Sequence, residues 1–487
     1  MSVDLTIKNG IVVSAAGAFR GGLSAENGVI VAMGADSILP AAETTVDAKG
    51  CVIFPGAIDP HVHLGVGGTA DEAKLTADFR TEPRAAATGG ITCFVTNHEN
   101  ATGPSYVTTT QTGTYDGREL TLLDKMKAIG EARSVIDFRF TALPQSRAHL
   151  DEIPRLVKEG VSSFKFYPSY DDEEAADFGI ERLDWGFIYE GFERLAAART
   201  PELAPIGMVH CEEPYICAML KRRLRAEGRP AGLAAWAESR PAIAEAMQIF
   251  DVGMIAKDTG CRAYIVHTSS RDGTDTIAYL KKLGVDIVGE TCTHYLVLTD
   301  QAQLERWAKV NPPIRGTEHQ NRLWEALVDG THEVVGSDDC GTYTRQEKLG
   351  KDFWDAIPGF SDMAASLTLL VSEGVNKNRL SWQQLARVIA ENPARYYGMY
   401  PRKGTLQVGS DADVVIIDPT EDWTIAAEAF NYTTDFSIYE GMRVRGRPVT
   451  TVVRGLVVAD HGEVVAPEGH GTYVASGVIK ALEGALA

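Results

Sequence analysis

The chain has 487 residues, of which 44 % are hydrophobic and 23 % are charged, which is ordinary for a soluble globular protein. Its net charge of −19 disfavours nucleic acid as a partner. No apolar stretch is long enough to span a bilayer, and the start MSVDLTIKNG lacks the features of a signal peptide, so we expect no membrane association. The seven cysteines form no CxxC pair, which favours a reduced, cytoplasmic protein.

Short apolar runs broken by glycine predict β-strands at both ends of the chain. LTIKNGIVVS, GVIVAMG and CVIFPG lie within residues 1–54, and DADVVIIDP, TTVVRGLVVAD and GEVVAP lie within residues 396–487. We expect these two segments to pair into one small β-sandwich. Residues 472–487, TYVASGVIKALEGALA, have the pattern of an amphipathic C-terminal helix, which would pack on its own subunit or contact another.

Residues 55–395 alternate strand-like apolar runs with longer helical patterns, which is typical of β/α units around a parallel sheet. One such helix is predicted from Ser239, as its N-cap, through Pro241 in the first turn to Gly260 at its end. The segment is long enough for a (β/α)₈ barrel. The predicted fold is therefore α/β, with a barrel of the TIM type over residues 55–395 and a β-sandwich built from the two terminal segments.

Several residues that can bind metals stand at the end of an apolar run, just before a loop. His61 and His63, in PGAIDPHVHLG, are two residues apart, and alternate side chains of a strand point the same way. The other residues in this position are Lys165, His210, His267 and Asp338. The carboxyl ends of barrel strands meet on one face, so we expect all six side chains to gather there, although each alone is more often structural.

Four imidazoles and a carboxylate suit zinc or a similar first-row ion such as Mn, Co or Fe. Such ions assist hydrolysis by making hydroxide available and by polarising a carbonyl, and Asp338 can move the proton to a leaving nitrogen. Lys165 has no lone pair while it is protonated. From the residues alone, it either holds an anionic substrate or adds carbon dioxide and bridges two cations as a carbamate.

The motifs PGAIDPHVHLG, SSFKFYPSY, MVHCEE, YIVHTSS, GETCTHYL, NPPIR and VVGSDDCG, in this order, resemble the hydantoinase/dihydropyrimidinase branch of the amidohydrolase superfamily. The resemblance runs from about residue 5 to residue 465. It implies a binuclear, metal-dependent cyclic amidohydrolase, in which a metal-bridging hydroxide opens a hydantoin, a dihydropyrimidine or a related cyclic imide or ureide. It also implies a homo-oligomer, a dimer or a tetramer.

The resemblance also implies roles for single residues. His61, His63 and Asp338 match the ligands of one metal ion and His210 and His267 those of the other, while Lys165 matches a bridging lysine carboxylated by CO₂ (N6-carboxylysine). Tyr170, in KFYPSY, matches a tyrosine that donates a hydrogen bond to the developing oxyanion. Asn311, in NPPIR, matches a position whose backbone contacts the substrate ring.

Some positions depart from the family pattern. Gly65 stands where dihydroorotases, which resemble this region, carry an arginine for the substrate carboxylate, and this argues against that activity. The asparagine of an IPNG-like segment is missing from AIPGF, residues 356–360, although a backbone contact can remain there. Residues 65–74 and 96–106 are expected to shape the pocket, with His98 and Glu99 solvated or structural.

Two other functions stay open. One is an allantoinase-like ureide hydrolase, and the other is a non-catalytic assembly protein of the dihydropyrimidinase-related kind, which lacks metal ligands. The competent residues at all six ligand positions favour catalysis. We expect His294 to be structural, and Cys340 not to be a nucleophile because no paired base accompanies it.

Overall fold

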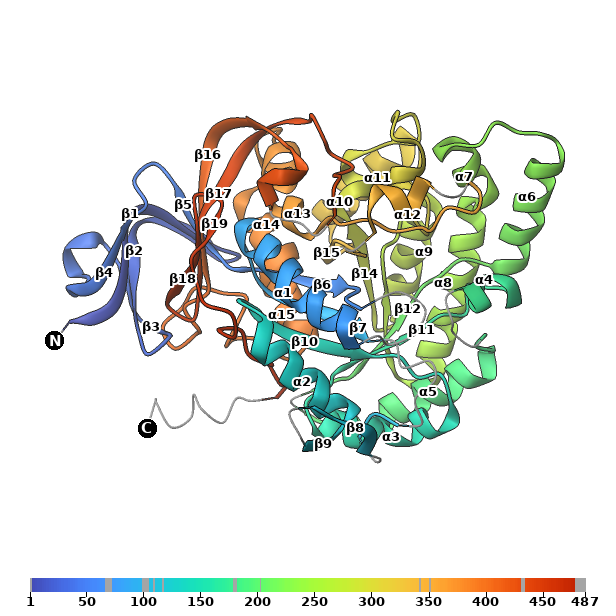
Figure 1. The fold of residues 1–487 in the computed structure, drawn as a ribbon, viewed down its shortest axis with the longest axis horizontal. Helices are drawn as coiled ribbons and strands as arrows, with labels where there is room; N and C mark the ends of the chain where they lie inside the picture. The colour runs from blue at the N-terminus through green and yellow to red at the C-terminus, as the bar shows by residue number, and fades with distance from the viewer. Residues whose placement is uncertain are drawn as a thin grey trace.

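The computed structural model describes residues 2–65, 72–98, 105–107, 110–115, 118–177, 182–201, 203–340, 343–349, 352–430 and 434–477. Within these ranges, an eight-stranded parallel sheet forms the centre of the molecule (Figure 1). Its strands lie side by side in the order in which they occur in the chain. They are β6 (Ala57–Val62), β7 (Ile91–His98), β10 (Asp137–Ala142), β11 (Ser163–Phe166), β12 (Ile206–Val209), β13 (Arg262–Ile265), β14 (Ile287–Cys292) and β15 (Val334–Gly336).

The sheet closes on itself as a barrel. Val62 of β6 forms a parallel bridge with Asp339, which follows β15, and the backbone N–H of His63 donates to the Asp339 carbonyl at 2.7 Å. The strands are short apolar runs with both faces buried, as parallel strands between helices and a filled interior require. The predicted barrel is confirmed.

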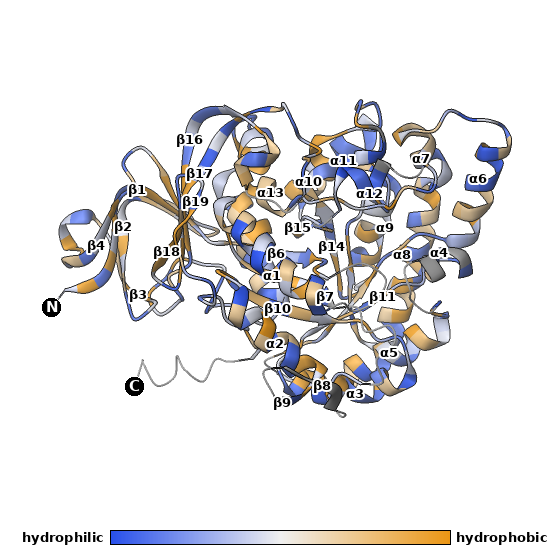
Figure 2. Ribbon diagram, viewed as in Figure 1, coloured by the Kyte–Doolittle hydropathy of each residue, from blue (hydrophilic) through white to orange (hydrophobic). Residues whose placement is uncertain are grey.

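Helices follow the strands and cover the outside of the barrel (Figure 1). They are α1 (Glu72–Thr88), α2 (Leu122–Arg133), α3 (Arg147–Lys158), α4 (Asp172–Asp177), α5 (Trp185–Ala197), α6 (Pro214–Ala226), α7 (Leu233–Ser239), α8 (Ala242–Thr259), α9 (Arg271–Lys282), α10 (Thr293–Val297), α11 (Thr317–Asp329), α12 (Arg345–Leu349), α13 (Met363–Leu369), α14 (Trp382–Ala386) and α15 (Asn392–Tyr396). Apolar residues gather on the central strands, whereas outer helices such as α6 and α11 carry polar stretches (Figure 2).

Shorter elements complete the barrel region and its connections. The π-helical turns η3 (Leu370–Val375) and η4 (Arg387–Glu391) continue α13 and α14, and β8 (Thr110–Tyr115) pairs with β9 (Arg118–Thr121). The 3₁₀ turns are η1 (Asp36–Ile38), η2 (Glu305–Ala308) and η5 (Ala427–Phe430). No helix in the ranges given above combines the length and the apolar character that crossing a bilayer requires.

The start of the helix predicted from Ser239 is wrong by two residues. The Ser239 hydroxyl donates to the carbonyl of Trp236 at 2.7 Å, so Ser239 ends α7 instead of capping the next helix. Pro241 is the N-cap of α8, and Gly260, with a φ of 74°, ends it as predicted.

The two ends of the chain share a second sheet, here called the terminal sheet. Its strands are β1 (Val3–Ser14), β2 (Gly17–Glu26), β3 (Val29–Gly34), β4 (Ala42–Asp47), β5 (Val52–Pro55), β16 (Val414–Thr424), β17 (Arg443–Val453), β18 (Leu456–Asp460) and β19 (Glu463–Val464). Antiparallel pairing of β5 with β16 joins the N-terminal and C-terminal strands at one end of the molecule (Figure 1). One core contains Leu23 and Ile53 together with Val414 and Val452, so the two segments pair and share a core, as expected.

The end of the chain returns to the barrel. Tyr473 forms a bridge with Phe138 of β10, and residues 472–477 are not helical. The remainder of the predicted C-terminal helix lies outside the described residues. The domain boundaries at residues 54 and 395 stay predictions.

Candidate metal centre

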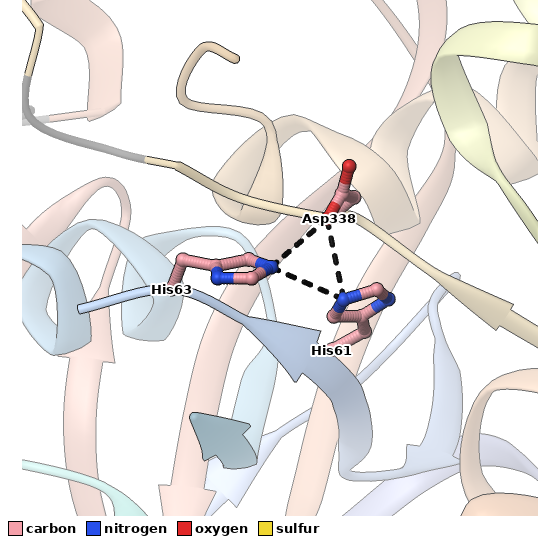
Figure 3. Close-up of side chains that lie close together, drawn as sticks. All are labelled: His61, His63 and Asp338. Carbon is pink, nitrogen blue, oxygen red and sulfur yellow. Dashed lines mark hydrogen bonds and ion pairs between the residues drawn. The ribbon is translucent and has the colours of Figure 1, made fainter. Parts of the chain in front are cut away.

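The closure of the barrel brings together His61 at the end of β6, His63 one residue beyond it, and Asp338 after β15. The Nε2 atoms of His61 and His63 are 3.2 Å apart, and each lies 3.3 Å from Asp338 Oδ1 (Figure 3). Three atoms with lone pairs thus face a common point. In a tetrahedral zinc site with ligand bonds of about 2.0–2.1 Å, ligand atoms are about 3.3 Å apart. The three residues therefore fit one metal ion.

Glu290 of β14 orients this cluster from behind. Its Oε1 lies 2.9 Å from His61 Nδ1 and also accepts the backbone N–H of His267 at 2.9 Å. Its Oε2 accepts the Tyr264 hydroxyl at 2.7 Å. A carboxylate on Nδ1 favours a proton there, which leaves the lone pair of His61 on Nε2, the atom that faces Asp338.

Lys165 reaches the same cluster from β11. Its side chain is fully buried, and its Nζ lies 2.5 Å from His61 Nε2 and 4.9 Å from the centre of the Tyr167 ring. An amine at this place is too close to the imidazole nitrogens to act only as a remote anchor for a substrate.

His210 and His267 form the other half of the site. They follow β12 and β13, and their ring centres are 4.4 Å apart, while the ring of His267 lies 5.3 Å from that of His61. Nδ1 of His267 is buried without a hydrogen-bond partner in the part of the chain that the structure describes. An orphaned buried nitrogen beside a second imidazole suits a metal ligand, since burying a polar atom without a partner is costly.

The orientation of His210 depends on two buried charged residues. Its Nε2 lies 3.0 Å from Glu212 Oε2, and the same oxygen accepts from Arg240 Nη1 at 2.8 Å. Glu212 thus contacts Nε2, so Nδ1 is the nitrogen of His210 that can ligate a cation. Burial alone would raise the pKa of the Glu212 carboxyl, but Arg240, His210 and Arg315 together outweigh burial and hold that pKa below its usual value.

The protonation states suit metal ligands. Burial lowers the pKa of His61, His210 and, most strongly, His267, so these imidazoles are neutral near pH 7 and keep a lone pair. Burial alone would raise the pKa of Asp338, but the adjacent His61 and His63 hold it well below its usual range. Asp338 is therefore an ionised carboxylate.

A cavity that opens to solvent lies in front of these residues. Tyr170 and Asn311, both predicted to contact substrate, line it. The Tyr170 ring stacks on Tyr167 at 5.9 Å and lies 5.3 Å from the His210 ring. Burial raises the pKa of Tyr170 well above its usual value, so its hydroxyl stays a hydrogen-bond donor.

The structure brings all six predicted ligands to one mouth of the barrel. It adds residues that the sequence analysis missed, namely Glu290, Glu212, Arg240, Tyr167, and Asn97, whose Nδ2 is 3.2 Å from His63 Nε2. Glu290 and Glu212 lie inside the quoted motifs GETCTHYL and MVHCEE, which is the signal that points to them.

Other predictions have mixed outcomes. Residues 66–71 and 99–104, which make up much of the expected pocket loops and include Glu99, lie outside the described residues, and so does the side chain of His98. His294 is buried with its Nδ1 3.0 Å from Asp362 Oδ2, away from the ligands, as expected for a structural residue. Cys340 lines the cavity.

Gly65 has a local reason to lack a side chain. Its φ is 78°, and a Cβ there would lie 3.1 Å from the side chain of Leu75. Its N–H donates to Asp78 Oδ2 at 2.7 Å. An arginine in this conformation would be strained, which agrees with the argument against a dihydroorotase.

A barrel that gathers four imidazoles, a carboxylate and a lysine at its strand ends defines a metal-dependent hydrolase. Residues 52–458 match the Amidohydrolase family. The chain is 33 % identical over 476 residues to an L-hydantoinase of Paenarthrobacter aurescens, covering 97 % of this chain and 98 % of that protein. It is 33 % identical over 481 residues to a D-hydantoinase of Geobacillus stearothermophilus, covering 96 % and 95 %.

A solved structure extends the comparison. The fold matches that of an L-hydantoinase (dihydropyrimidinase) from Arthrobacter aurescens with a TM-score of 0.85 and 32 % identity, covering 97 % of this chain and 100 % of the other. The chain therefore belongs to the amidohydrolase family, in its hydantoinase/dihydropyrimidinase branch. Its activity is that of a metal-dependent cyclic amide hydrolase.

Proposed function

We propose that the residues at the strand ends hold two divalent cations, of which zinc suits the donors best. His61, His63 and Asp338 would hold one cation, His210 and His267 would hold the other, and Lys165, as N6-carboxylysine, would serve both. The donor separations of 3.2–3.3 Å around His61 carry this proposal. The neutral Lys165 amine would add to CO₂ and release one proton, which gives a carbamate with two ligand oxygens.

Bound there, two such cations supply Lewis acidity toward a ring carbonyl and make hydroxide available near neutral pH. Asp338, held as a carboxylate, accepts the proton of the attacking water and returns it to the ring nitrogen as the C–N bond breaks. Tyr170 donates a hydrogen bond to the oxyanion. Its place in the cavity wall beside His210 supports this role.

The substrate is the neutral ring of a hydantoin, a dihydropyrimidine or a related cyclic imide or ureide. Among the described residues, the cavity lining other than the candidate ligands, Tyr167 and Tyr170 consists of Val310, Asn311, Cys340, Tyr343, Pro358 and Gly359, none of which carries a fixed charge. Asn311 contacts the ring through its backbone. The backbone of residues 358–359 can take the place of the asparagine that AIPGF lacks.

The proposal is tested on enzyme reconstituted with zinc and bicarbonate. We expect about two metal ions per chain, and turnover of hydantoin, 5-substituted hydantoins or dihydrouracil that exceeds turnover of allantoin. Tyr170→Phe should lower kcat by about 10²–10³ with metal content unchanged, because one oxyanion donor is lost. The control Tyr279→Phe removes a hydroxyl from an exposed residue outside the cavity lining and should change kcat less than about threefold.

Each alternative predicts a different result. Preference for allantoin would identify a ureide hydrolase. A chain that retains no metal after careful reconstitution would be an assembly protein. If two ions bind and no ring is opened, the proposed mechanism is wrong.

We also infer a homo-oligomer, a dimer or a tetramer. Helix α8 exposes an apolar row of Ile243, Met247, Phe250 and Met254, whose spacing places them on one helix face. Such a row can pack against the same row of a second copy across a two-fold axis. The cytoplasmic location stays a prediction, supported by the seven cysteines, all within the described residues, of which none lies in a disulfide.

A further inference from the structure

Lys309 stands behind the cavity wall, one residue before Val310. Its side chain is buried, with only 2 % of the residue exposed. Its Nζ donates to the carbonyls of Trp354 and Ala356 at 2.8 Å and 2.7 Å, and its own carbonyl accepts the N–H of Gly359 at 2.9 Å. Three hydrogen bonds thus tie residue 309 to the segment 354–359.

Aromatic rings enclose the Lys309 amine. Nζ lies 4.1 Å from the Trp236 ring centre and 5.8 Å from that of Phe353. The Trp236 indole N–H donates to the carbonyl of Val310 at 3.0 Å and to Asn311 Oδ1 at 3.2 Å. Lys309 and Trp236 therefore hold both sides of one wall, residues 310–311 and residues 358–359.

The choice of lysine at this position needs a reason. An apolar side chain of similar length, such as methionine, would fill the same space without the cost of burying an amine. What methionine lacks is the pair of hydrogen-bond donors that reach Trp354 and Ala356. The donors therefore explain why a lysine occupies an aromatic enclosure.

The wall that Lys309 supports is tightly packed. Gly359 has a φ of 106°, and a Cβ there would lie 2.7 Å from Cys340 Cβ. The N–H of Cys340 in turn donates to the carbonyl of Phe360 at 3.0 Å. A shift of residues 354–359 would therefore change the gap between this wall and the loop that carries Asp338.

We propose that Lys309 is a positioning residue that sets the separation of the two wall segments and so determines which ring substituents the cavity accepts. It does not touch the substrate, and it acts through the backbone of residues 310–311 and 358–359. The kinetic part of this inference rests on the proposed function, whereas its structural part does not.

The test compares Lys309→Met with Lys348→Met. Lys348 is also a buried lysine beside aromatic rings, but its amine donates to the carbonyl of Trp307 at 3.3 Å. In Lys309→Met we expect KM for hydantoin to rise about tenfold, kcat to change less than threefold, and metal content to stay the same. The ratio of kcat/KM for 5-phenylhydantoin over hydantoin should also change, because the gap is altered. Lys309→Gln keeps donor hydrogens, so its KM should lie between that of the wild type and that of Lys309→Met.

A second readout needs no activity. Amide hydrogen exchange within residues 354–359, the segment bound by Lys309, should become about tenfold faster in Lys309→Met and stay unchanged in Lys348→Met. Unchanged exchange, or an unchanged KM and substrate ratio in an active and folded variant, overturns the proposal. The proposal is also overturned if Lys309→Met loses metal, or if its kcat falls by the same factor as its KM rises. Either result would show that Lys309 supports the metal centre. If the wild-type enzyme opens no ring, the proposed function fails, and the exchange result still decides the role of Lys309.

Discussion

Burial decides the charge of the residues that matter most at this site. Burial holds the pKa of His267 well below its usual value, because desolvation penalises the imidazolium. The same effect lowers the pKa of Lys309 to about 6, with Lys221 and Arg240 acting in the same direction. Glu174 and Asp355 oppose the shift only in part.

This shift predicts a pH dependence of stability. The usual pKa of lysine is 10.5, so between pH 6 and 10.5 the unfolded chain binds a proton at Lys309 that the folded chain does not. Wild-type stability therefore rises with pH in this window, by up to about 1.4 kcal/mol per unit, and Lys309→Met lacks this slope. For a chain of this length that is about 1 °C in Tm per pH unit.

Scanning calorimetry of both proteins at pH 7, 8 and 9 measures the difference. The Tm of the wild type should rise relative to the Tm of Lys309→Met with each increase in pH. Parallel pH profiles would mean that the folded protein keeps the Lys309 proton.

The six ligand candidates could be predicted from the sequence because each ends an apolar run, and the barrel brings strand ends together. Glu290 lies within the motif GETCTHYL, but its role could not be predicted from that motif alone, since its partners His61 and His267 come from other strands. Lys309 could not be predicted either, because its acceptors are carbonyls, which leave no trace in a sequence.

At the scale of elements, the alternation of strand and helix patterns predicted the barrel. The short apolar runs at the two ends of the chain predicted the strands of the terminal sheet. The error at Ser239 shows the limit. A serine before a proline fits both the end of one helix and the start of the next, and only the bond of its hydroxyl to the Trp236 carbonyl decides. Pairing of β5 with β16 likewise depends on tertiary contacts that no local pattern contains.

The junction of barrel and terminal sheet contains a buried lysine. Lys403 Nζ lies 2.6 Å from Asp137 of β10, 2.6 Å from Asp413 and 3.0 Å from Asp411, the last two just before β16. Arg454 also pairs with Asp137. The three carboxylates lie as close together as the ligands of a metal ion would, but the Lys403 ammonium already occupies the position of the cation.

Lys403→Met should destabilise the protein by about 3–5 kcal/mol, because buried carboxylates lose their partner. The expected fall in Tm is about 3–5 °C for a chain of this length, measured by calorimetry. Lys377→Met, which removes an exposed pair with Glu373, is the matched control and should change Tm by less than about 1 °C. Equal effects of the two changes would show that the junction does not depend on this network.

At the scale of the whole molecule, the exposed row on α8 predicts how copies associate. Phe250→Glu places a charge in that row and should shift the protein toward smaller species in light scattering. Val465→Glu, at a residue of the terminal-sheet region that is 58 % exposed, should not. A wild type that is monomeric at micromolar concentration would contradict the prediction.

The barrel's seam lies between β6 and β15, and His61, His63 and Asp338 stand on its two sides. A nascent chain possesses the histidine pair early but gains the aspartate only after some 280 further residues have been synthesised. The three-atom cluster therefore comes into being when the last strand docks on the first. Cation uptake at this position would fasten the seam, so loading and completion of the fold would be a single event.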